Sequence, residues 1–179
     1  MRKERQLTQP REMRPNDTEL RRLLDRNEIS DVQIRYATGT DSRDWKLFRT
    51  CFTDDVEVDF SEGFGQPVTR TTADEWVAGT APRMESFKAT QHMITNQAIT
   101  FDGDDHATCV AYVRASHHLP NSLGDSDQTV YGYYTNQFTR TPSGWRIARV
   151  KLTPLWMTGN LGIFQSALAE ESAPSAGEA

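Results

Sequence analysis

The stretch HMITNQAITFDGDDHATCVAYVRASHH, residues 92–118, decides the fold because it predicts two long strands joined by a tight turn. Residues 92–101 predict the first strand, and the acidic, glycine-containing DGDD that follows is typical of a hairpin loop. Residues 106–118 predict the second strand. Two further strands are expected at 128–140 and 144–157, with the turn sequence TPSG before the last of them. The second half of the chain therefore predicts an antiparallel meander.

The chain before this stretch predicts helices. Apolar residues at three-to-four spacing predict the first helix. Asp17 or Thr18 is expected to cap its start, and Gly39 is expected to loosen its end. Thr72 is the expected cap of the last helix, and residues 55–60 alternate like a strand. The expected helices cover residues 18–39, 43–52 and 71–87. Helices followed by an antiparallel sheet predict an α+β protein, in which a curved sheet leaves a pocket beside the helices.

The length of 179 residues fits one domain with a sizeable hydrophobic core. We expect this domain to span residues 18–164. Residues 1–17 are charged and contain almost no apolar side chains, and residues 165–179 are small and acidic. Both ends are therefore expected to be disordered tails.

The charge of the chain excludes some function classes. The net charge is -5 at pH 7, and no basic excess suitable for binding phosphates is present, so nucleic acid is not an expected partner. No apolar run approaches the roughly 20 residues of a membrane helix, and the charged N-terminus contains no apolar signal core. We expect a cytoplasmic protein without a membrane partner. Cys51 and Cys109 fit no metal-binding spacing and are expected to be buried.

The alternation of side chains along the strands predicts which residues face the pocket. His92 is expected to share a face with Ile94, and the same alternation places Asn96, Ala98 and Thr100 there. On the next strand a face of small residues ends in His117, while His118 points the other way. The two adjacent histidines therefore cannot chelate as one unit. That face is compatible with an apolar pocket that holds one polar group.

A carboxylate that orients a histidine turns it into a useful general base. Asp41 follows the apolar stripe of the first helix, where its side chain can turn inward. Asp44, which can cap the next helix, is almost as good a candidate from sequence physics alone. The other candidates are Asp54, Asp55 and Asp59.

The segments YATGTDSRDWKLFRTCFTDDVEVDF (36–60), TQHMITN (90–96) and RASH (114–117) resemble the SnoaL-like, nuclear-transport-factor-2-like superfamily. The chain is most similar to its scytalone dehydratase-type members, and also resembles the dehydrochlorinase and bile-acid 7α-dehydratase types. The resemblance covers about residues 20–160. It implies a cone-shaped α+β barrel, in which three N-terminal helices pack on a strongly curved mixed or antiparallel sheet.

The resemblance also implies site residues. Asp41 and His92 match the aspartate and histidine of the catalytic dyad, and His117 matches the second catalytic histidine of the scytalone type. Tyr36 matches a pocket tyrosine five residues before the aspartate of the bile-acid type. The implied chemistry is elimination, in which His92 removes a proton from carbon and His117 protonates a leaving hydroxyl.

The chain departs from the scytalone type at the groups that activate the substrate carbonyl. Thr40 and Phe60 stand where that type has two tyrosines, and only Asn136 lies near its third-strand polar pair. Tyr134, like Tyr36, Tyr131 or Tyr133, could replace the missing groups, because a phenol donates a hydrogen bond to a developing oxyanion. The expected substrate-binding residues are Tyr36, Thr40, Phe60, Tyr134 and Asn136.

The leading function is a cofactor-independent lyase of the dehydratase type, acting on a small hydrophobic cyclic substrate such as a polyketide, terpenoid or steroid. An isomerase, a polyketide cyclase or a dehydrohalogenase would use the same dyad. A non-catalytic binding module, or the small subunit of a ring-hydroxylating dioxygenase, is the alternative of another class. The family resemblance also implies a homo-oligomer, either a trimer or a dimer.

Two histidines and a carboxylate could instead form a facial triad for iron. The resemblance is to metal-free relatives, so neither a metal nor an organic cofactor is expected.

Overall fold

The computed structural model describes residues 16–122 and 124–164, and these residues form the predicted α+β fold. The helices are α1 (Asp17–Asp41), α2 (Trp45–Arg49), α3 (Ser61–Phe64) and α4 (Ala73–Glu85). The strands are β1 (Phe52–Asp59), β2 (Thr69–Thr72), β3 (Ala89–Asp102), β4 (His106–His118), β5 (Asp127–Thr141) and β6 (Gly144–Gly159).

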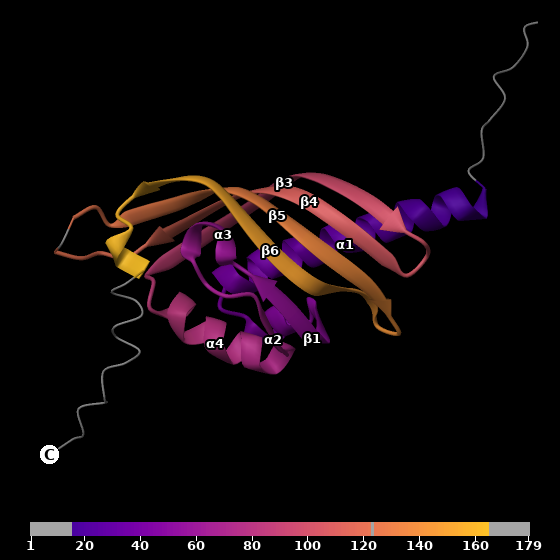
Figure 1. Cartoon of the computed structure of the whole chain (residues 1–179), viewed down its shortest axis with the longest axis horizontal. Helices are drawn as coiled ribbons and strands as arrows, with labels where there is room; N and C mark the ends of the chain where they lie inside the picture. The colour runs from indigo at the N-terminus through magenta and orange to yellow at the C-terminus, as the bar shows by residue number, and fades with distance from the viewer. Residues whose placement is uncertain (1–15, 123, 165–179) are drawn as a thin grey trace, which may run out of the picture.

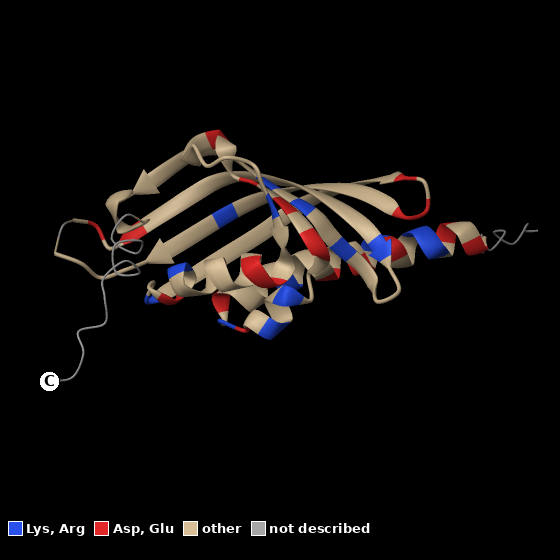
Figure 2. Ribbon diagram, turned by 60° about the horizontal axis from the view of Figure 1, so that its bottom comes forward, with Lys and Arg blue, Asp and Glu red and all other residues tan. Residues whose placement is uncertain are grey.

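The six strands form one mixed sheet in the order β2-β1-β6-β5-β4-β3. Strand β1 runs parallel to β6, and every other neighbouring pair in this order is antiparallel. The long strands β3 to β6 curve over α1, and the other helices lie on the same side of the sheet (Figures 1 and 2). The fold is therefore the cone-shaped α+β barrel expected from the sequence.

The start of α1 differs from the prediction, because Asn16 is the cap in place of Asp17 or Thr18. The Asn16 side chain accepts a hydrogen bond from the Glu19 backbone N–H (2.8 Å), and the Glu19 carboxylate accepts one from the Asn16 backbone N–H (3.0 Å). This capping box requires an acidic residue three positions after the cap, and only Asn16 has one among the three candidates.

The face predicted for β3 is correct for its first half only. A bulge between Thr95 and Ala98, where Asn96 has a φ of 52°, shifts the register against β4. One extra residue reverses the alternation, so that Ile99 and Phe101 point inward. Asn96, Ala98 and Thr100 therefore do not share the face of His92.

Two short elements follow β1 that the sequence did not predict. Helix α3 is a single turn, and β2 pairs antiparallel with β1 at the edge of the sheet. Both are too short to show a period in the sequence. The end of the sheet opposite β3 is therefore one strand wider than predicted.

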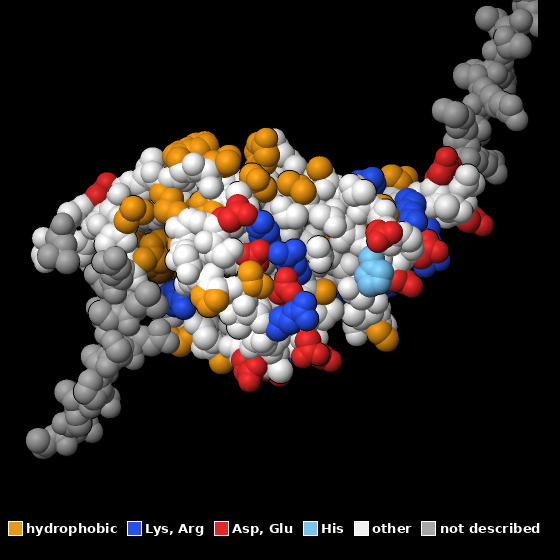
Figure 3. Space-filling model, viewed as in Figure 1, with side chains coloured by type: hydrophobic (Ala, Val, Ile, Leu, Met, Phe, Trp, Pro, Cys, Tyr) orange, Lys and Arg blue, Asp and Glu red, His pale blue; other side chains and the backbone are white. Residues whose placement is uncertain are grey.

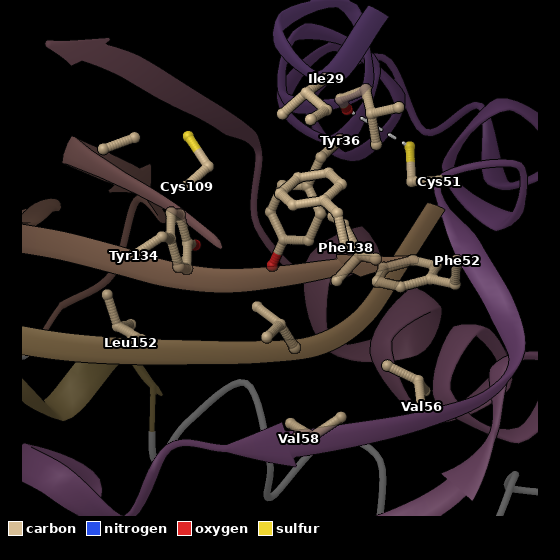
Figure 4. Packing of buried hydrophobic residues seen from close by; sticks show 14 of the residues in the cluster. Ile29, Tyr36, Cys51, Phe52, Val56, Val58, Cys109, Tyr134, Phe138 and Leu152 are labelled. Carbon is tan, nitrogen blue, oxygen red and sulfur yellow. Dashed lines mark hydrogen bonds between the residues drawn. The ribbon is translucent and has the colours of Figure 1, made fainter. Parts of the chain in front are cut away.

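The core lies between the concave face of the sheet and the helices. Tyr36 of α1 projects toward Tyr134 and Phe138 of β5, as Figure 4 shows. Trp145, Phe138 and Ile147 are almost fully buried. Cys51 and Cys109 are buried and unpaired, as predicted. This packing fixes α1 against β5 and β6, and so sets the position of the residues at its C-terminal end.

The predicted N-terminal tail falls outside the described residues except for Asn16 and Asp17, and the predicted tail at 165–179 falls outside them entirely. Within the described ranges, no helix combines the length and apolar character needed to cross a membrane. Acidic and basic side chains are interspersed on the face shown in Figure 3. The structure thus shows no basic patch on this face.

Gly39 does not loosen the end of α1, because the helix continues through it to Asp41. A Cβ atom at Gly39 would lie 2.8 Å from the backbone nitrogen of Phe48, so the missing side chain lets α2 approach. Gly79 lies inside α4, where an added Cβ atom would meet open space, with nothing packed within 4 Å of it. The two glycines both lie inside helices but differ in packing, so the same substitution to alanine can be compared at a crowded and at an open position.

We expect Gly39→Ala to lower the free energy of unfolding by about 1–3 kcal/mol, because it forces apart two packed backbones. Gly79→Ala is expected to raise that free energy by about 0.5–1 kcal/mol, since alanine favours the helix and meets open space. Urea denaturation of both variants measures the two values. Equal effects of the two substitutions would contradict the close approach at Gly39.

Candidate functional site

A cavity of about 410 Å³ lies between the sheet and the helices. Its lining is mostly aromatic and aliphatic, and it comes from all four helices, from β3 to β6 and from residues 161–164. Ten of the twenty-one lining residues carry a polar side-chain group. They are Thr40, Gln66, Trp76, Thr80, Arg83, His92, His117 and Gln128, together with Tyr36 and Tyr134. Such a cavity suits a small, largely apolar ligand whose orientation a few polar groups fix.

Asp41 and His92 form a hydrogen-bonded pair at one wall of the cavity. Asp41 is the last residue of α1, and His92 lies near the start of β3. The Nδ1 atom of His92 lies 2.7 Å from Oδ1 of Asp41, and the His92 backbone N–H donates to Oδ2 at 2.7 Å. His92 lines the cavity, whereas Asp41 is not among the lining residues. Asp41 therefore lies behind the imidazole ring and fixes its orientation.

A second group of hydrogen bonds holds Asp41 in place. The Thr90 hydroxyl donates to Oδ1 of Asp41 (2.9 Å), and Arg43 donates to the Thr90 hydroxyl oxygen (2.7 Å) and to the carbonyl oxygen of Thr40 (2.6 Å). Arg43 adopts a φ of 59°, which places it in the left-handed region that few non-glycine residues occupy. The turn after α1 is thus shaped to bring this guanidinium to Thr90.

The pKa of Asp41 lies below its ordinary value. Burial by itself raises this pKa, but hydrogen bonds from the His92 ring and backbone, the attraction of His92 and the hydrogen bond from Thr90 outweigh it. Asp41 therefore carries a negative charge at neutral pH, as a residue that orients an imidazole N–H requires.

His117 lies beside His92, with 5.6 Å between ring centroids and the two rings nearly perpendicular. The rings of Phe87 and Phe164 pack against it at 5.0 and 4.6 Å. Burial lowers the pKa of His117 to about 3, and the neighbouring His92 adds to this effect. His117 is therefore a neutral imidazole at physiological pH. The side chain of Gln128, which lies opposite His117 in the sheet, partly opposes this lowering.

Four of the predicted substrate-binding residues line the cavity: Tyr36, Thr40, Phe60 and Tyr134. Burial raises the pKa of Tyr134 to about 12 and raises the pKa of Tyr36 well above its ordinary value, so both phenols remain protonated. The hydroxyl of Thr40 donates to the Tyr36 carbonyl oxygen at 2.8 Å. Because this hydroxyl is already bonded to the helix backbone, Thr40 contributes its methyl group to the apolar lining of the cavity.

Asn136 is not one of the lining residues. Its side-chain amide donates to Gln33 of α1 at 3.1 Å inside the core, where both residues are fully buried. Asn136 lies on the buried face of β5. Because α1 covers this part of the sheet, the residue meets a helix there.

Three of the four remaining aspartate candidates have other partners, and the fourth, Asp55, is an exposed residue of β1. Asp44 caps α2 through the Leu47 backbone N–H (2.9 Å), as its position before the helix predicted. Asp54 pairs with Arg49, and Asp59 accepts hydrogen bonds from Ser61 and Arg149. Within residues 16–122 and 124–164, the aspartate that hydrogen-bonds the His92 ring at the cavity is Asp41. No group of three or more side chains arranged to bind a metal occurs in the same ranges.

Sequence reasoning missed several polar residues of the site. Thr90 lies two positions before His92 and on the same face of β3, so the strand period could have identified it. Gln128 pairs with His117 in the register of β4 and β5, which the sequence alone does not supply. Trp76, Thr80 and Arg83 share one face of α4. Helical spacing predicts that face but not what it contacts.

Comparison with known proteins gives consistent similarities. A family model described as a SnoaL-like domain matches residues 21–151. The Kfla4162 protein from Kribbella flavida is 33% identical, with a TM-score of 0.75 over 82% of this chain and 99% of its own. A candidate aromatic ring hydroxylase from Novosphingobium aromaticivorans is 27% identical, with a TM-score of 0.69 over 79% and 97% of the two chains. A candidate scytalone dehydratase from the same organism is 21% identical, with a TM-score of 0.68 over 78% and 90%, and shows similarity of fold.

Proposed function

Because this chain belongs to the SnoaL-like domain family, we propose that it is a cofactor-independent lyase of the dehydratase type. The family membership confirms the resemblance inferred from the sequence. The observation that supports the proposed activity is the Asp41–His92 pair, whose imidazole lines a mostly apolar cavity. The proposed substrate is a small cyclic molecule with a hydroxyl group that can be eliminated.

His92 acts as the base in this proposal. Its Nδ1–H donates to Asp41, so the lone pair is on Nε2, the ring nitrogen that is left for a ligand. This nitrogen removes a proton from the carbon next to the one that bears the hydroxyl group. The charge that develops on the ring is stabilised by the Asp41 carboxylate behind it.

The role of His117 in this proposal differs from the one that the family resemblance implied, which was to protonate the leaving hydroxyl. Because it is neutral, it acts as a hydrogen-bond donor to the leaving oxygen and not as a charged acid. The C–O bond breaks as the new C=C bond forms, and the hydroxide that leaves takes up the proton held by His92. The products are the unsaturated compound and one water molecule, and His92 returns to its neutral form.

The same base serves the other reactions weighed from the sequence, since the substrate determines whether a hydroxide, a halide or no group leaves. A non-catalytic subunit of a ring-hydroxylating oxygenase is the second candidate. Its support is the similarity to the candidate aromatic ring hydroxylase. Co-purification with a larger iron-containing chain would favour it. A homo-oligomeric state and a cytoplasmic location stay predictions.

We expect nitrogen NMR shifts of the rings, recorded at pH 8, to show the proton of His92 on Nδ1. This pH lies above the ordinary histidine pKa of about 6.5. In Asp41→Asn the side-chain amide can donate to Nδ1, which would move the ring proton to Nε2 and remove the base. The experiment needs no substrate.

The pair formed by His118 and Asp127 supplies a matched control, because its Nδ1–Oδ1 distance is 2.6 Å and it lies at the surface. Asp127→Asn should alter the signals of His118 and leave those of His92 unchanged. An unaltered His92 tautomer in Asp41→Asn would contradict the proposed coupling and favour the non-catalytic candidate. With the expected result, hydroxylated cyclic ketones and related alcohols are the first compounds to screen for loss of water.

A further inference from the structure

Helix α4 presents three polar side chains to the cavity. Trp76, Thr80 and Arg83 lie four and three residues apart, which places them on one face of the helix, and all three line the cavity. The atoms Trp76 Nε1, Thr80 Oγ1 and Arg83 Nε are buried, and none has a hydrogen-bond partner within the described residues. We call this set the α4 donor face.

Unpaired buried donors are uncommon in folded proteins, because each loses its hydrogen bonds to water without replacement. Three on consecutive turns of one helix, all at the wall of a cavity, indicate a place that a ligand completes. Arg83 differs from four arginines of α2 and the sheet, whose guanidinium groups pair with carboxylates. Those are Arg49, Arg70, Arg140 and Arg149. Arg83 forms no ion pair with any residue that the structure describes.

The chemistry of the α4 donor face is one-sided. Trp76 and Arg83 can only donate hydrogen bonds, and a hydroxyl such as that of Thr80 can donate as well. The complementary group is therefore an acceptor, and the guanidinium favours one with negative charge and two oxygens. A carboxylate has this shape, since its oxygens accept from an arginine and still have lone pairs for further donors.

The sheet side of the cavity has the opposite character. His92, His117 and Gln128 line it, and the buried Gln128 amide interacts with the His117 ring. These groups offer acceptors as well as donors, as a hydroxyl group requires. The two walls thus differ in what they can bind.

We propose that the substrate of this site is a small cyclic or aromatic hydroxy acid, whose carboxylate binds to Arg83, Thr80 and Trp76. Its hydroxyl-bearing carbon then faces His92 and His117. The orientation rests on the proposed function, whereas the carboxylate preference does not. Arg83 is the residue that determines specificity for the acid.

The test measures binding of 1-naphthoate and of 1-naphthamide, two probes of nearly equal shape of which only the first is charged. In ligand-observed NMR titrations at pH 7, the wild type should bind naphthoate about 10- to 100-fold more tightly, as hydrogen bonds to charged groups imply. Arg83→Gln should remove this preference. Thr80→Val should reduce it by a smaller factor, because it removes one neutral donor.

Lys88→Gln is the matched control, since it removes the same charge from an exposed position five residues further along the chain. It should leave the preference unchanged. Equal binding of the two probes by the wild type would overturn the proposal, and so would a preference that persists in folded Arg83→Gln. If Arg83→Gln does not fold, Thr80→Val decides the question by the same ratio.

The outcome is separable from that of the proposed function. Asp41→Asn leaves the α4 donor face intact, so it should keep the preference for naphthoate even though it disables the base. A naphthoate preference in a protein whose His92 tautomer does not respond to Asp41 would refute the proposed lyase mechanism and support the acid site. A responsive tautomer without the preference would do the reverse.

Discussion

Replacement of His92 by glutamine is expected to lower kcat by about 10²–10⁴-fold, the range that a positioned general base contributes. Glutamine keeps a polar side chain in the cavity but has no basic nitrogen. Asp41→Asn should cause a loss in the same range, because it leaves the imidazole in place with the wrong tautomer. Both variants should change KM much less than kcat. The measurement is steady-state kinetics on the substrate found in the screen.

His118 provides the control for this loss. It also pairs with an aspartate through Nδ1, but its side chain is 42% exposed and points away from the cavity. His118→Gln should retain wild-type kcat. If His92→Gln also retained it while folded, the base would have to be another residue, and the proposed mechanism would be wrong.

The strand periodicity predicted the sheet side of the site better than any other signal. The alternating face that ends in His117 is buried from Ala107 onward, and the bounds of β4 agree with those expected at 106–118. A period of two needs no long-range information as long as the strand is regular. The bulge at Asn96 breaks that condition. A left-handed backbone at an asparagine is common enough in turns that the residue type alone does not reveal a bulge.

The helix side of the site was harder to predict. The α4 helix was expected from its cap and its length, but its contacts depend on where the chain places it in space. Arg83 and Thr80 look like ordinary exposed residues in a sequence, since nothing local indicates that their donors lack partners. The turn after α1 is a similar case, because the contact between Arg43 and Thr90 joins residues 47 positions apart. Long-range contacts of this kind are visible only in the structure.

The second large effect concerns a buried ion pair that connects α1 to the sheet and does not line the cavity. Asp25 is 4% exposed and accepts hydrogen bonds from Arg140 (2.7 Å) and from the Trp145 indole N–H (3.1 Å). The Arg140 guanidinium also lies over the Trp145 ring, 4.5 Å from its centroid. These three residues come from α1, β5 and β6. Their contacts therefore connect the helix to the strands that carry the core.

We expect Arg140→Met to lower the free energy of unfolding by about 3–5 kcal/mol, because it leaves the Asp25 carboxylate buried without its counter-charge. The double variant Asp25→Leu with Arg140→Met should recover part of this loss, since no charge then remains buried. Recovery is incomplete because the Trp145 N–H loses its acceptor. Urea denaturation measures all three values. Arg70→Met, which breaks an exposed pair with Glu57, is the control and should cost at most about 1 kcal/mol.

The pH dependence gives an independent test of the same pair. Burial raises the pKa of Asp25, but the hydrogen bonds from Arg140 and Trp145 and the charge of Arg140 bring it below the ordinary value. A carboxylate whose pKa is lower in the folded state stabilises the protein fully above its unfolded pKa, about 3.9, and this contribution is lost as the pH falls through the folded value. The stability difference between the wild type and Asp25→Asn should therefore be constant from pH 7 to 5 and shrink below pH 4. A difference that stays constant down to pH 3 would mean that the pKa of Asp25 is the same in the folded and unfolded states, and would contradict the charge pairing. Arg140→Met gives a second check, because only a charged Asp25 makes the loss of Arg140 costly.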